Sequence, residues 1–552
     1  MQNEQQIAAK PKVLVVGNGM VGHKFIDCLL DAKGDGHHIL TFSEEPRLAY
    51  DRVQLSSYFS GASVNDLMLT SEQYYQEKGV SFLLRDKVVE LDREQKCVIT
   101  ESGRKEDYDK LVLATGSFPF VPPIPGNDQE HCLVYRTIED LEAITASAQS
   151  SKVGVVVGGG LLGLEAANAL KHLGLESHVV EFAPRLMAVQ LDEGGGALLR
   201  RKIESLGVGV HTEKATKEIV AGSERRYRMN FADGSFLETD MIVFSAGIRP
   251  QDALAREFGL DIGERGGIVV NNFCQTSDEN IYAIGECALW GGRIFGLVSP
   301  GYTMAKVAAC HISGDCEEFV GADMSTKLKL LGVDVASIGD AHGRTQGCLN
   351  YSYYDDSEEV YKSLVVSADG KHLLGAVLVG DVSDYGGWLQ LMLNKLEIPT
   401  SPEELLFPKE DVVFDVESLP QEALICACNS VTKGQIEQAV IAGARDMNAI
   451  KQQTLASTGC GSCGALAEQV FEAKMADLGY EVGGPADAVA GIFLSGLSAG
   501  NISPDKLLAL GAITKEFNLS TQVAGDNRLE LVGVSPEQLL VLEQRLSAAG
   551  LA

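Results

Sequence analysis

Short apolar runs alternate along the chain with longer stretches of helical spacing, which is the pattern of an α/β protein with parallel strands. A strand is predicted at 12–16 and a helix at 20–30, with a glycine-rich turn between them. The same order returns with a strand at 152–157 and a helix at 161–173. The repeat predicts two Rossmann-type units, because a strand, a glycine turn and a helix are the start of each such unit.

The two glycine turns have the spacing of dinucleotide fingerprints. Their glycines are Gly17, Gly19 and Gly22 in the first turn and Gly158, Gly160 and Gly163 in the second. Such glycines permit a tight turn and let a pyrophosphate approach the N-terminus of the following helix. The sequence therefore predicts two bound dinucleotides.

An acidic residue at the end of the next strand is expected to bind ribose hydroxyls. Glu44, or its neighbour Glu45, takes this place in the first unit, and Glu181 takes it in the second. A carboxylate at Glu181 accepts hydrogen bonds from a 2′-hydroxyl and repels a 2′-phosphate, which favours NADH over NADPH. Arg185 follows four residues later and keeps NADPH open as the alternative.

Charge and composition narrow the class of protein. The 552 residues exceed one hydrophobic core, so we expect about three to five domains. A net charge of −30 argues against binding to nucleic acid or to an anionic membrane. The polar N-terminus lacks the apolar stretch of a signal peptide, so we expect a cytoplasmic protein with reduced thiols.

Four of the twelve cysteines form a spaced set, Cys426-X-Cys428 and Cys460-X-X-Cys463. Structural zinc sites generally use two to four residues between paired cysteines, so the one-residue spacer argues against zinc. The spacing also differs from plant-type and bacterial ferredoxins. We expect these cysteines to hold a metal centre, with zinc as the alternative to an iron–sulfur cluster.

Three further segments make the chain resemble the pyridine nucleotide–disulfide oxidoreductase superfamily: 108–117, 241–250 and 280–288. The resemblance implies FAD in the first unit and NAD(P)H in the second. It also implies cofactor contacts from the segments that close over the nucleotides, namely Ala114, Thr115, Gly116, Gly247, Gly285 and Glu286. Glu286 replaces the family's Asp and is one methylene longer.

Two more residues are placed by resemblance. The stretch 50–56 is similar to that of ferredoxin-reductase-like flavoenzymes, in which the arginine, here Arg52, contacts FAD. The lysine usual in those relatives is Ser57. Glu165 would lie near the nicotinamide as a catalytic residue; the alternative is an acid that stabilises a helix N-terminus.

No redox thiol accompanies the flavin motif, because 46–61 contains no cysteine and no Cys-X-X-Cys lies in the second unit. The cysteine set is similar to the bacterioferritin-associated-ferredoxin-like (BFD-like) domain, which holds a [2Fe–2S] cluster. NADH gives two electrons, flavin releases them singly, and a cluster takes one at a time. We therefore expect electrons to run from NAD(P)H through FAD to the cluster.

The whole order resembles the N-terminal half of the assimilatory NAD(P)H nitrite reductase large subunit. The resemblance implies FAD-binding parts at 10–120 and 246–320, an NAD(P)H-binding domain at 121–245 and an α/β interface domain at 321–415. A small helical [2Fe–2S] domain at 420–485 and a ferredoxin-like half-domain at 490–552 follow, the latter with helix, strand and helix at 504–517, 529–532 and 535–549.

No cysteine follows Cys463, although the family's sirohaem centre needs four more. The expected function is therefore an NADH-dependent electron donor to a separate nitrite or nitrate reductase catalytic chain in nitrogen assimilation. An NADH:ferredoxin-type reductase for another one-electron acceptor, or a redox-sensing interaction module, stays open. Self-association as a homodimer also stays open.

Overall fold

The computed structural model describes residues 10–34, 36–314, 318–399, 401–407, 416–427, 429–458 and 463–478, with short stretches beyond residue 490. The chain divides into two compact units. The first comprises Met1–Asp415, Leu419–Thr432 and Ala456–Leu466; the second comprises Val416–Ser418, Lys433–Leu455 and Ala467–Ala552. All nine cysteines of the described residues are free thiols.

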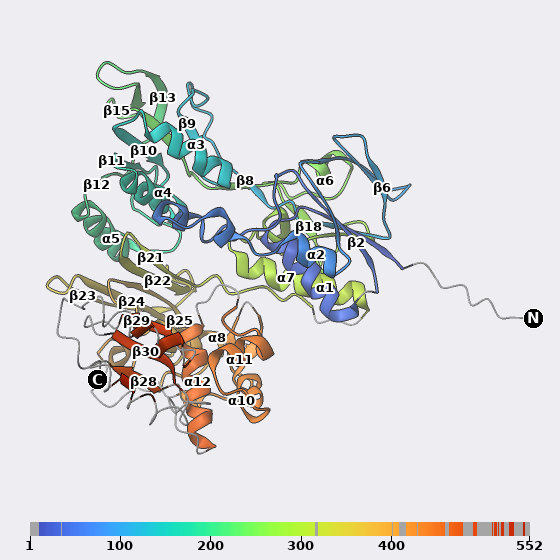
Figure 1. Cartoon of the computed structure of the whole chain (residues 1–552). Coiled ribbons are helices and arrows are strands. Elements are labelled where there is room, and N and C mark those ends of the chain that lie inside the picture. Colours follow the sequence, from blue (N-terminus) through green and yellow to red (C-terminus); the bar gives the residue numbers. More distant parts are fainter. Residues whose placement is uncertain are drawn as a thin grey trace, which may run out of the picture. The chain divides into compact units, whose positions relative to one another are not determined.

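The first nucleotide-binding domain, drawn with α1, α2 and α7 in Figure 1, is built on a five-stranded parallel sheet in the order β19-β7-β1-β2-β3. Its strands are β1 (Lys12–Val16), β2 (His38–Ser43), β3 (Ser81–Leu84), β7 (Lys110–Leu113) and β19 (Ile281–Ala283). Helices α1 (Met20–Lys33) and α7 (Val298–Ser313) pack together, and α2 (Glu72–Glu77) precedes β3. Apolar runs such as 13–16 are fully or nearly buried, as a parallel sheet covered on both faces requires.

The second nucleotide-binding domain repeats this plan in the order β12-β11-β10-β16-β9. Its strands are β9 (Cys132–Val134), β10 (Val153–Val157), β11 (Glu176–Val180), β12 (Val208–His211) and β16 (Met241–Phe244), and its helices are α3 (Ile138–Ala148), α4 (Leu161–His172) and α5 (Glu193–Ser205). The two parallel sheets confirm the predicted pair of Rossmann-type units.

Smaller elements complete these two domains. One antiparallel sheet consists of β4 (Val88–Asp92), β5 (Cys97–Thr100) and β6 (Lys105–Asp107), and another of β13 (Thr216–Ala221), β14 (Tyr227–Phe231) and β15 (Phe236–Thr239). Two strand pairs are β8 (Ser117–Pro119) with β17 (Ile248–Pro250) and β18 (Ile268–Val270) with β20 (Ala288–Trp290). The other elements are the helix α6 (Ala253–Glu257) and the 3-10 turns η1 (Leu55–Ser60), η2 (Val64–Leu67) and η3 (Gly285–Cys287).

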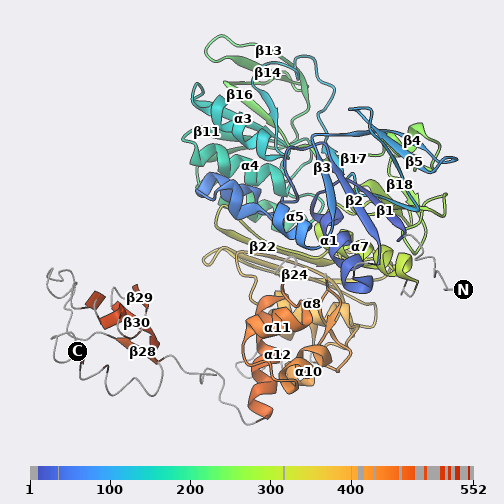
Figure 2. The ribbon, with the colours of Figure 1, turned by 45° about the vertical axis from the view of Figure 1, so that its right-hand side comes forward.

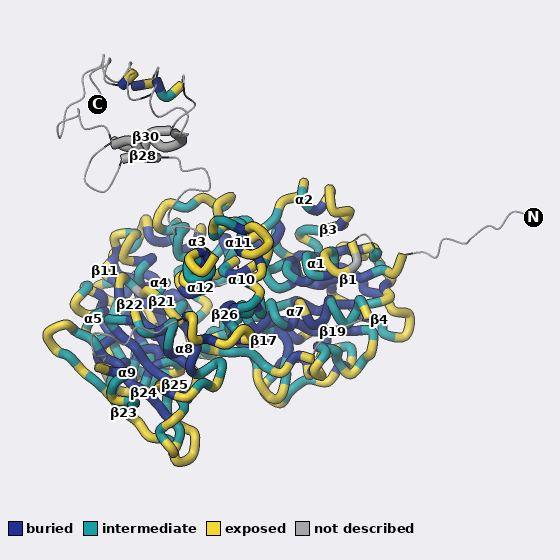
Figure 3. The backbone as a smooth tube through the Cα atoms, turned by 90° about the horizontal axis from the view of Figure 1, so that it is seen from below, coloured by how far each residue is buried: buried dark blue, intermediate teal, exposed yellow. Residues whose placement is uncertain are grey.

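A third domain consists of one antiparallel sheet in the order β21-β22-β25-β24-β23. Its strands are β21 (Thr326–Leu330), β22 (Val333–Gly339), β23 (Leu349–Asp355), β24 (Val360–Val366) and β25 (Leu373–Val379), followed by α8 (Tyr385–Leu393) and α9 (Pro402–Leu406). The sheet lies between α5 and α8 (Figure 2). Strands β24 and β25 are almost entirely buried (Figure 3), so both faces of this sheet are covered.

The remaining elements are short. The hairpin β26 (Leu424–Cys426) and β27 (Val431–Thr432) precedes α10 (Lys433–Ile441), α11 (Met447–Thr454) and α12 (Gly464–Asp477), and the turn η4 (Val416–Ser418) comes before it. Helices α10 and α11 lie between the two cysteine pairs in the sequence. Strand β30 (Leu529–Val534) confirms the predicted strand of the half-domain, and it pairs with β28 (Ala490–Phe493) and β29 (Ser520–Val523), which the sequence pattern missed.

Candidate functional site

The first glycine turn follows β1 directly and is shaped by close backbone contacts. Gly17 has φ +107°, and a Cβ on it would lie 2.2 Å from the Ala114 carbonyl oxygen. A Cβ on Gly22 would lie 2.1 Å from the Gly17 carbonyl oxygen. Gly19 differs, because the space in front of it is open and it caps α1 without any side-chain hydrogen bond. The N–H groups of this helix terminus are thus free to receive an anion, which fits a pyrophosphate.

A cavity of about 270 Å³ adjoins this turn and is lined by Gly17, Glu44 and Thr115, among others. Glu44 forms an ion pair of 2.9 Å with Lys87, which also lines the cavity. Glu45 is turned elsewhere, toward Tyr50. The structure therefore brings Glu44, rather than its neighbour, to the cavity at the carboxyl end of the parallel sheet, where nucleotides bind in such folds.

The predicted closing segments meet beside this turn. Thr115 donates to the Gln251 carbonyl oxygen at 2.6 Å, and Gln251 N–H donates to the Gly116 carbonyl oxygen at 2.9 Å. The Gly247 carbonyl oxygen accepts from Phe120 N–H at 2.8 Å. Gly285 packs against the Val21 side chain, where a Cβ would lie 3.3 Å away. Segments far apart in the sequence thus converge on the first turn.

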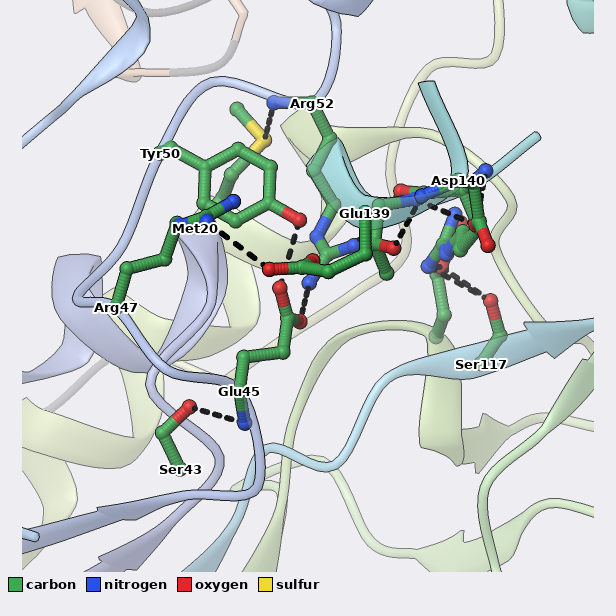
Figure 4. Close-up of polar contacts among 12 residues, drawn as sticks. Met20, Ser43, Glu45, Arg47, Tyr50, Arg52, Ser117, Glu139 and Asp140 are labelled. Carbon is green, nitrogen blue, oxygen red and sulfur yellow. Dashed lines mark hydrogen bonds and ion pairs between the residues drawn. The ribbon is translucent and has the colours of Figure 1, made fainter. Parts of the chain in front are cut away.

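Figure 4 shows that Arg52 lies in a network of polar contacts rather than alone. Its guanidinium pairs with Glu45 and donates to the Arg136 carbonyl oxygen at 2.9 Å. Tyr50 donates to the same Glu45 carboxylate at 2.7 Å, and the Arg52 guanidinium lies 4.8 Å from the centre of the Tyr50 ring. Arg52 therefore spans from the first nucleotide-binding domain to the segment between β9 and α3.

Glu286 is bound from two sides. Its carboxylate oxygen accepts from Arg136 at 2.6 Å and from the Ser117 hydroxyl at 2.6 Å. The longer side chain of Glu allows this ion pair across the two nucleotide-binding domains, and Arg47 makes a second crossing to Glu139 at 3.0 Å. Sequence reasoning missed Arg136, which lies between β9 and α3.

The second glycine turn repeats the geometry of the first. Gly158 has φ +120°, and a Cβ on Gly163 would lie 1.9 Å from the Gly158 carbonyl oxygen. Gly160 faces open space and caps α4 without a side-chain hydrogen bond. Glu181 accepts from Gly159 N–H at 2.5 Å and from Ala183 N–H at 2.6 Å. The carboxylate is thus held beside the open helix terminus, as a ribose-binding acid would be.

Two cationic residues lie near Glu181, Arg185 in sequence and Lys214 through a backbone hydrogen bond, and both bind other groups. The Arg185 guanidinium donates to the Leu191 carbonyl oxygen at 3.0 Å, and its methylene groups pack against Gly196, whose added Cβ would lie 2.8 Å from Arg185 Cδ. The Lys214 ammonium pairs with Asp233 and donates to the Ser235 hydroxyl at 3.0 Å. Neither cation is held for a 2′-phosphate.

Glu165 lies in the second turn of α4, and the described residues offer its carboxylate no hydrogen bond and no ion pair. Burial raises the pKa of Glu165 to about 7. The Tyr135 hydroxyl nearby is buried without a hydrogen-bond partner in the described part of the chain. Burial, and then the charge of Glu165, raise the pKa of Tyr135. The Glu165 carboxyl, about half protonated near pH 7, thus shares a largely apolar environment with the protonated Tyr135 hydroxyl.

The cysteine set is described only in part. Cys426 is buried at the end of β26, and Cys463 directly precedes α12. Cys428 and Cys460 lie outside the described residues, so the four-thiolate set stays a prediction. The two cysteine-bearing loops are joined by a hydrogen bond of 3.2 Å from Asn429 to Thr458.

Within the described ranges, no helix has both the length and the apolar character needed to cross a bilayer.

Three family models match the chain. Residues 11–311 match the pyridine nucleotide-disulphide oxidoreductase family, 325–396 the rubredoxin NAD+ reductase C-terminal domain, and 424–473 the BFD-like [2Fe-2S] binding domain. The second of these covers the domain for which the sequence pattern had supplied only a fold class. The third confirms the interpretation of the cysteine spacing as a [2Fe–2S] domain rather than a zinc site.

Named relatives agree with this assignment. The nitrite reductase (NADH) large subunit of Escherichia coli (strain K12) is 46% identical over 98% of this chain and 74% of its own length. The assimilatory nitrate reductase electron transfer subunit of Bacillus subtilis (strain 168) is 38% identical over 84% of this chain and 59% of its own length. The chain thus spans between about three fifths and three quarters of these two relatives.

A solved structure confirms the fold. The ferredoxin reductase for the CYP199A2 system from Rhodopseudomonas palustris aligns with a TM-score of 0.65 and 27% identity, over 74% of this chain and 99% of that one.

Proposed function

The chain belongs to the pyridine nucleotide-disulphide oxidoreductase family, and we propose that it passes electrons from NADH to a nitrite- or nitrate-reducing centre outside these 552 residues. It is an NAD(P)H-dependent flavin and [2Fe–2S] oxidoreductase of the nitrite reductase large-subunit type. We propose in addition that the chain prefers NADH, that the residues named above form its cofactor sites, and that a nitrite- or nitrate-reducing centre is its terminal acceptor.

One observation carries the proposal: the two dinucleotide turns and a [2Fe–2S] domain share a chain that lacks a redox thiol in the flavin motif. Cys287 is the cysteine adjoining the flavin-side Glu286, and its sulfur lies 3.3 Å from the Leu113 carbonyl oxygen. Complete burial raises the pKa of Cys287. A protonated core thiol is a poor nucleophile, so the cluster is left as the outlet for electrons.

The residues of the chain have distinct roles in this scheme. Bound FAD would supply the ability to take a hydride from NAD(P)H and to release electrons one at a time, which a [2Fe–2S] cluster requires. The open helix termini at Gly19 and Gly160 bind the two pyrophosphates, and Glu44 and Glu181 bind the ribose hydroxyls. The Arg136–Glu286 ion pair holds the two nucleotide-binding domains together at the flavin motif.

Glu165 is proposed to lie beside the nicotinamide, where a carboxyl with a pKa of about 7 holds or releases a proton near neutrality.

The terminal acceptor is proposed from the relatives. One is named a nitrite reductase large subunit and another an electron transfer subunit of nitrate reductase. Both names describe a protein that works with a further subunit. We propose that this chain also works with a further subunit. We further propose domain boundaries at 10–120, 121–245, 246–320, 321–415, 420–485 and 490–552.

The test is a reductive titration. Purified protein should show flavin and [2Fe–2S] absorption, and NADH should bleach both. The variant Cys460→Ser should lose transfer to one-electron acceptors but keep flavin reduction. A cluster that stays oxidised while the flavin is reduced, or a colourless zinc protein, would contradict the proposed order.

A second candidate is a general NADH:ferredoxin-type reductase. The rubredoxin-NAD(+) reductase of Alcanivorax borkumensis (strain ATCC 700651 / DSM 11573 / NCIMB 13689 / SK2) is 28% identical over 67% of this chain, and the ferredoxin reductase structure supports the same class. Affinity purification from the source cell separates the two candidates, because the copurifying chain identifies the acceptor. Nitrite consumption by the copurified complex would support the first candidate.

A further inference from the structure

The domain at 325–396 has no role in the electron path proposed above, yet its sheet is bound on both faces. Along β24, alternate side chains point in opposite directions. Tyr361 and Ser363 contact the N-terminus of α5, in the NAD(P)H-binding domain. Leu364 and Val366 belong to the apolar cluster that includes α8. Strand β24 thus contacts α5 with one face and the apolar cluster of α8 with the other.

The α5 face is fixed by Asp192, the N-cap of that helix. One of its oxygens accepts from Gly195 N–H at 2.9 Å. The other accepts from the Tyr361 hydroxyl at 2.7 Å and from the Ser363 hydroxyl at 2.9 Å. Lys202 on the same helix forms an ion pair of 2.9 Å with Glu359.

Close packing explains why α5 begins with glycines. A Cβ on Gly194 would lie 2.4 Å from the Tyr361 ring, and one on Gly195 would lie 2.8 Å from Val377. Glycine costs a helix about 1 kcal/mol relative to alanine. The glycines therefore lower the intrinsic stability of the first turn of α5 but allow the helix to pack directly against the sheet.

The opposite face carries α8, whose apolar side chains Tyr385, Trp388 and Leu391 are buried. Asn394 is the C-cap of this helix, and its side chain makes two kinds of hydrogen bond. Its amide N–H donates to the Gln390 side-chain oxygen at 2.8 Å. Its carbonyl oxygen accepts from Leu424 N–H at 2.9 Å.

Leu424 begins β26, the strand that ends at Cys426. Asn394 therefore ties the end of α8 to the strand that carries the first predicted cluster ligand.

Gln390 supports this contact at a cost to stability. It is completely buried, and its amide nitrogen has no acceptor in the described part of the chain. An unsatisfied buried donor costs about 1–3 kcal/mol. The oxygen of the same amide orients Asn394, which gives this buried polar group a reason to be present.

We propose that the 325–396 domain is a bridge that sets the position of the cluster-bearing strand relative to the NAD(P)H-binding domain, with Asn394 as its positioning residue. The inference rests on the proposed electron path. Asn394 acts through the backbone of β26, so its loss should slow electron arrival at the cluster without changing hydride transfer to the flavin.

The experiment compares Asn394→Ala, Asn394→Asp and the control Asn350→Ala, which alters an exposed asparagine of the same sheet. Stopped-flow absorption follows flavin and cluster reduction by NADH separately, and hydrogen exchange follows the Leu424 amide. Asn394→Ala should slow cluster reduction about fivefold, as loss of one ordinary hydrogen bond predicts, and should speed Leu424 exchange. Asn394→Asp keeps the acceptor for the Leu424 N–H but loses the N–H donated to Gln390, so both readouts should fall between those of Asn394→Ala and wild type.

Gln390→Leu separates positioning from stability. It removes the unsatisfied amide, so it should raise the melting temperature while still slowing cluster reduction. Equal cluster reduction rates in Asn394→Ala and wild type, or a parallel fall in flavin reduction, would overturn the inference. If NADH fails to reduce the cluster of the wild-type protein, the electron path itself fails, while Leu424 exchange still tests the bridge.

Discussion

At the scale of single residues, we propose that the environment of Glu181 determines the preference for NADH over NADPH. Two backbone N–H groups hold the carboxylate in place, and the cations that could neutralise a 2′-phosphate are bound elsewhere. The repulsion between Glu181 and a 2′-phosphate is therefore uncompensated.

This arrangement predicts the effect of Glu181→Gln. The ratio of kcat/KM for NADH to that for NADPH should fall about tenfold or more, because a charge-assisted hydrogen bond to ribose and the repulsion of phosphate are both lost. Steady-state kinetics with the two coenzymes measures it. Arg185→Ala is the matched control and should leave the ratio unchanged, since the guanidinium binds the Leu191 carbonyl oxygen. A higher KM for NADPH in this control would contradict the assignment.

Glu165 predicts a pH-dependent stability. Burial raises its pKa from 4.5 to about 7, so the folded state binds a proton that the unfolded state releases between these values. Stability from this group is complete below pH 4.5 and is lost as the pH rises to about 7. At pH 8, Glu165→Gln should therefore be more stable than wild type by up to about 3 kcal/mol.

Thermal unfolding at saturating FAD measures this difference, which should shrink as the pH is lowered to 5. A constant difference between the two proteins across this range would exclude a raised pKa.

The sequence located the acids but could not choose among them. Glu44 and Glu45 both follow β2, and only the folded chain shows that Tyr50 and Arg52 bind the second of them. The partner of Glu286 was equally hidden, because Arg136 lies 150 residues away in sequence. A glycine fingerprint predicts the local backbone conformation, whereas these side-chain contacts depend on how distant segments of the chain pack together.

At the scale of elements, the two glycines at the start of α4 have different tasks. Gly160→Ala meets no atom of the chain, so the fold should survive, but the methyl group enters the space proposed for the pyrophosphate. Gly163→Ala meets the Gly158 carbonyl oxygen at 1.9 Å and should cost about 1–3 kcal/mol or more.

The expected results are a raised KM for NADH at normal melting temperature in Gly160→Ala, and a lowered melting temperature in Gly163→Ala. Both variants should keep their flavin, because the first glycine turn is untouched. The interpretation fails if Gly160→Ala binds NADH normally.

Elements with strong periodicity were predictable, and those outside it were not. The two parallel sheets follow from apolar spacing and glycine turns. Strands β28 and β29 did not, because their segments are short and lack a clear alternation of apolar and polar residues.

At the scale of the whole molecule, the Asp192 side chain links two domains, because it caps α5 and accepts hydrogen bonds from β24 of the third domain. Asp192→Ala removes a helix cap and two hydrogen bonds to the third domain, so it should lower the free energy of unfolding by about 3 kcal/mol. Tyr361→Phe removes only one of these bonds and should cost about 1 kcal/mol.

Urea unfolding followed by tryptophan fluorescence measures both variants, because Trp388 is buried in this domain and the chain has only one other tryptophan. Equal losses in the two variants would show that Asp192 acts through Tyr361 alone.

The two faces of β24 have a consequence for insertions and deletions. Because side chains alternate along a strand, a change of one residue within Val360–Val366 would exchange the α5-facing and α8-facing sets over the rest of the strand. Point substitutions weaken one contact at a time, whereas such a frame change would undo both at once. The length of this strand is therefore under tighter constraint than the identity of most of its residues, and related chains should vary there by substitution rather than by insertion.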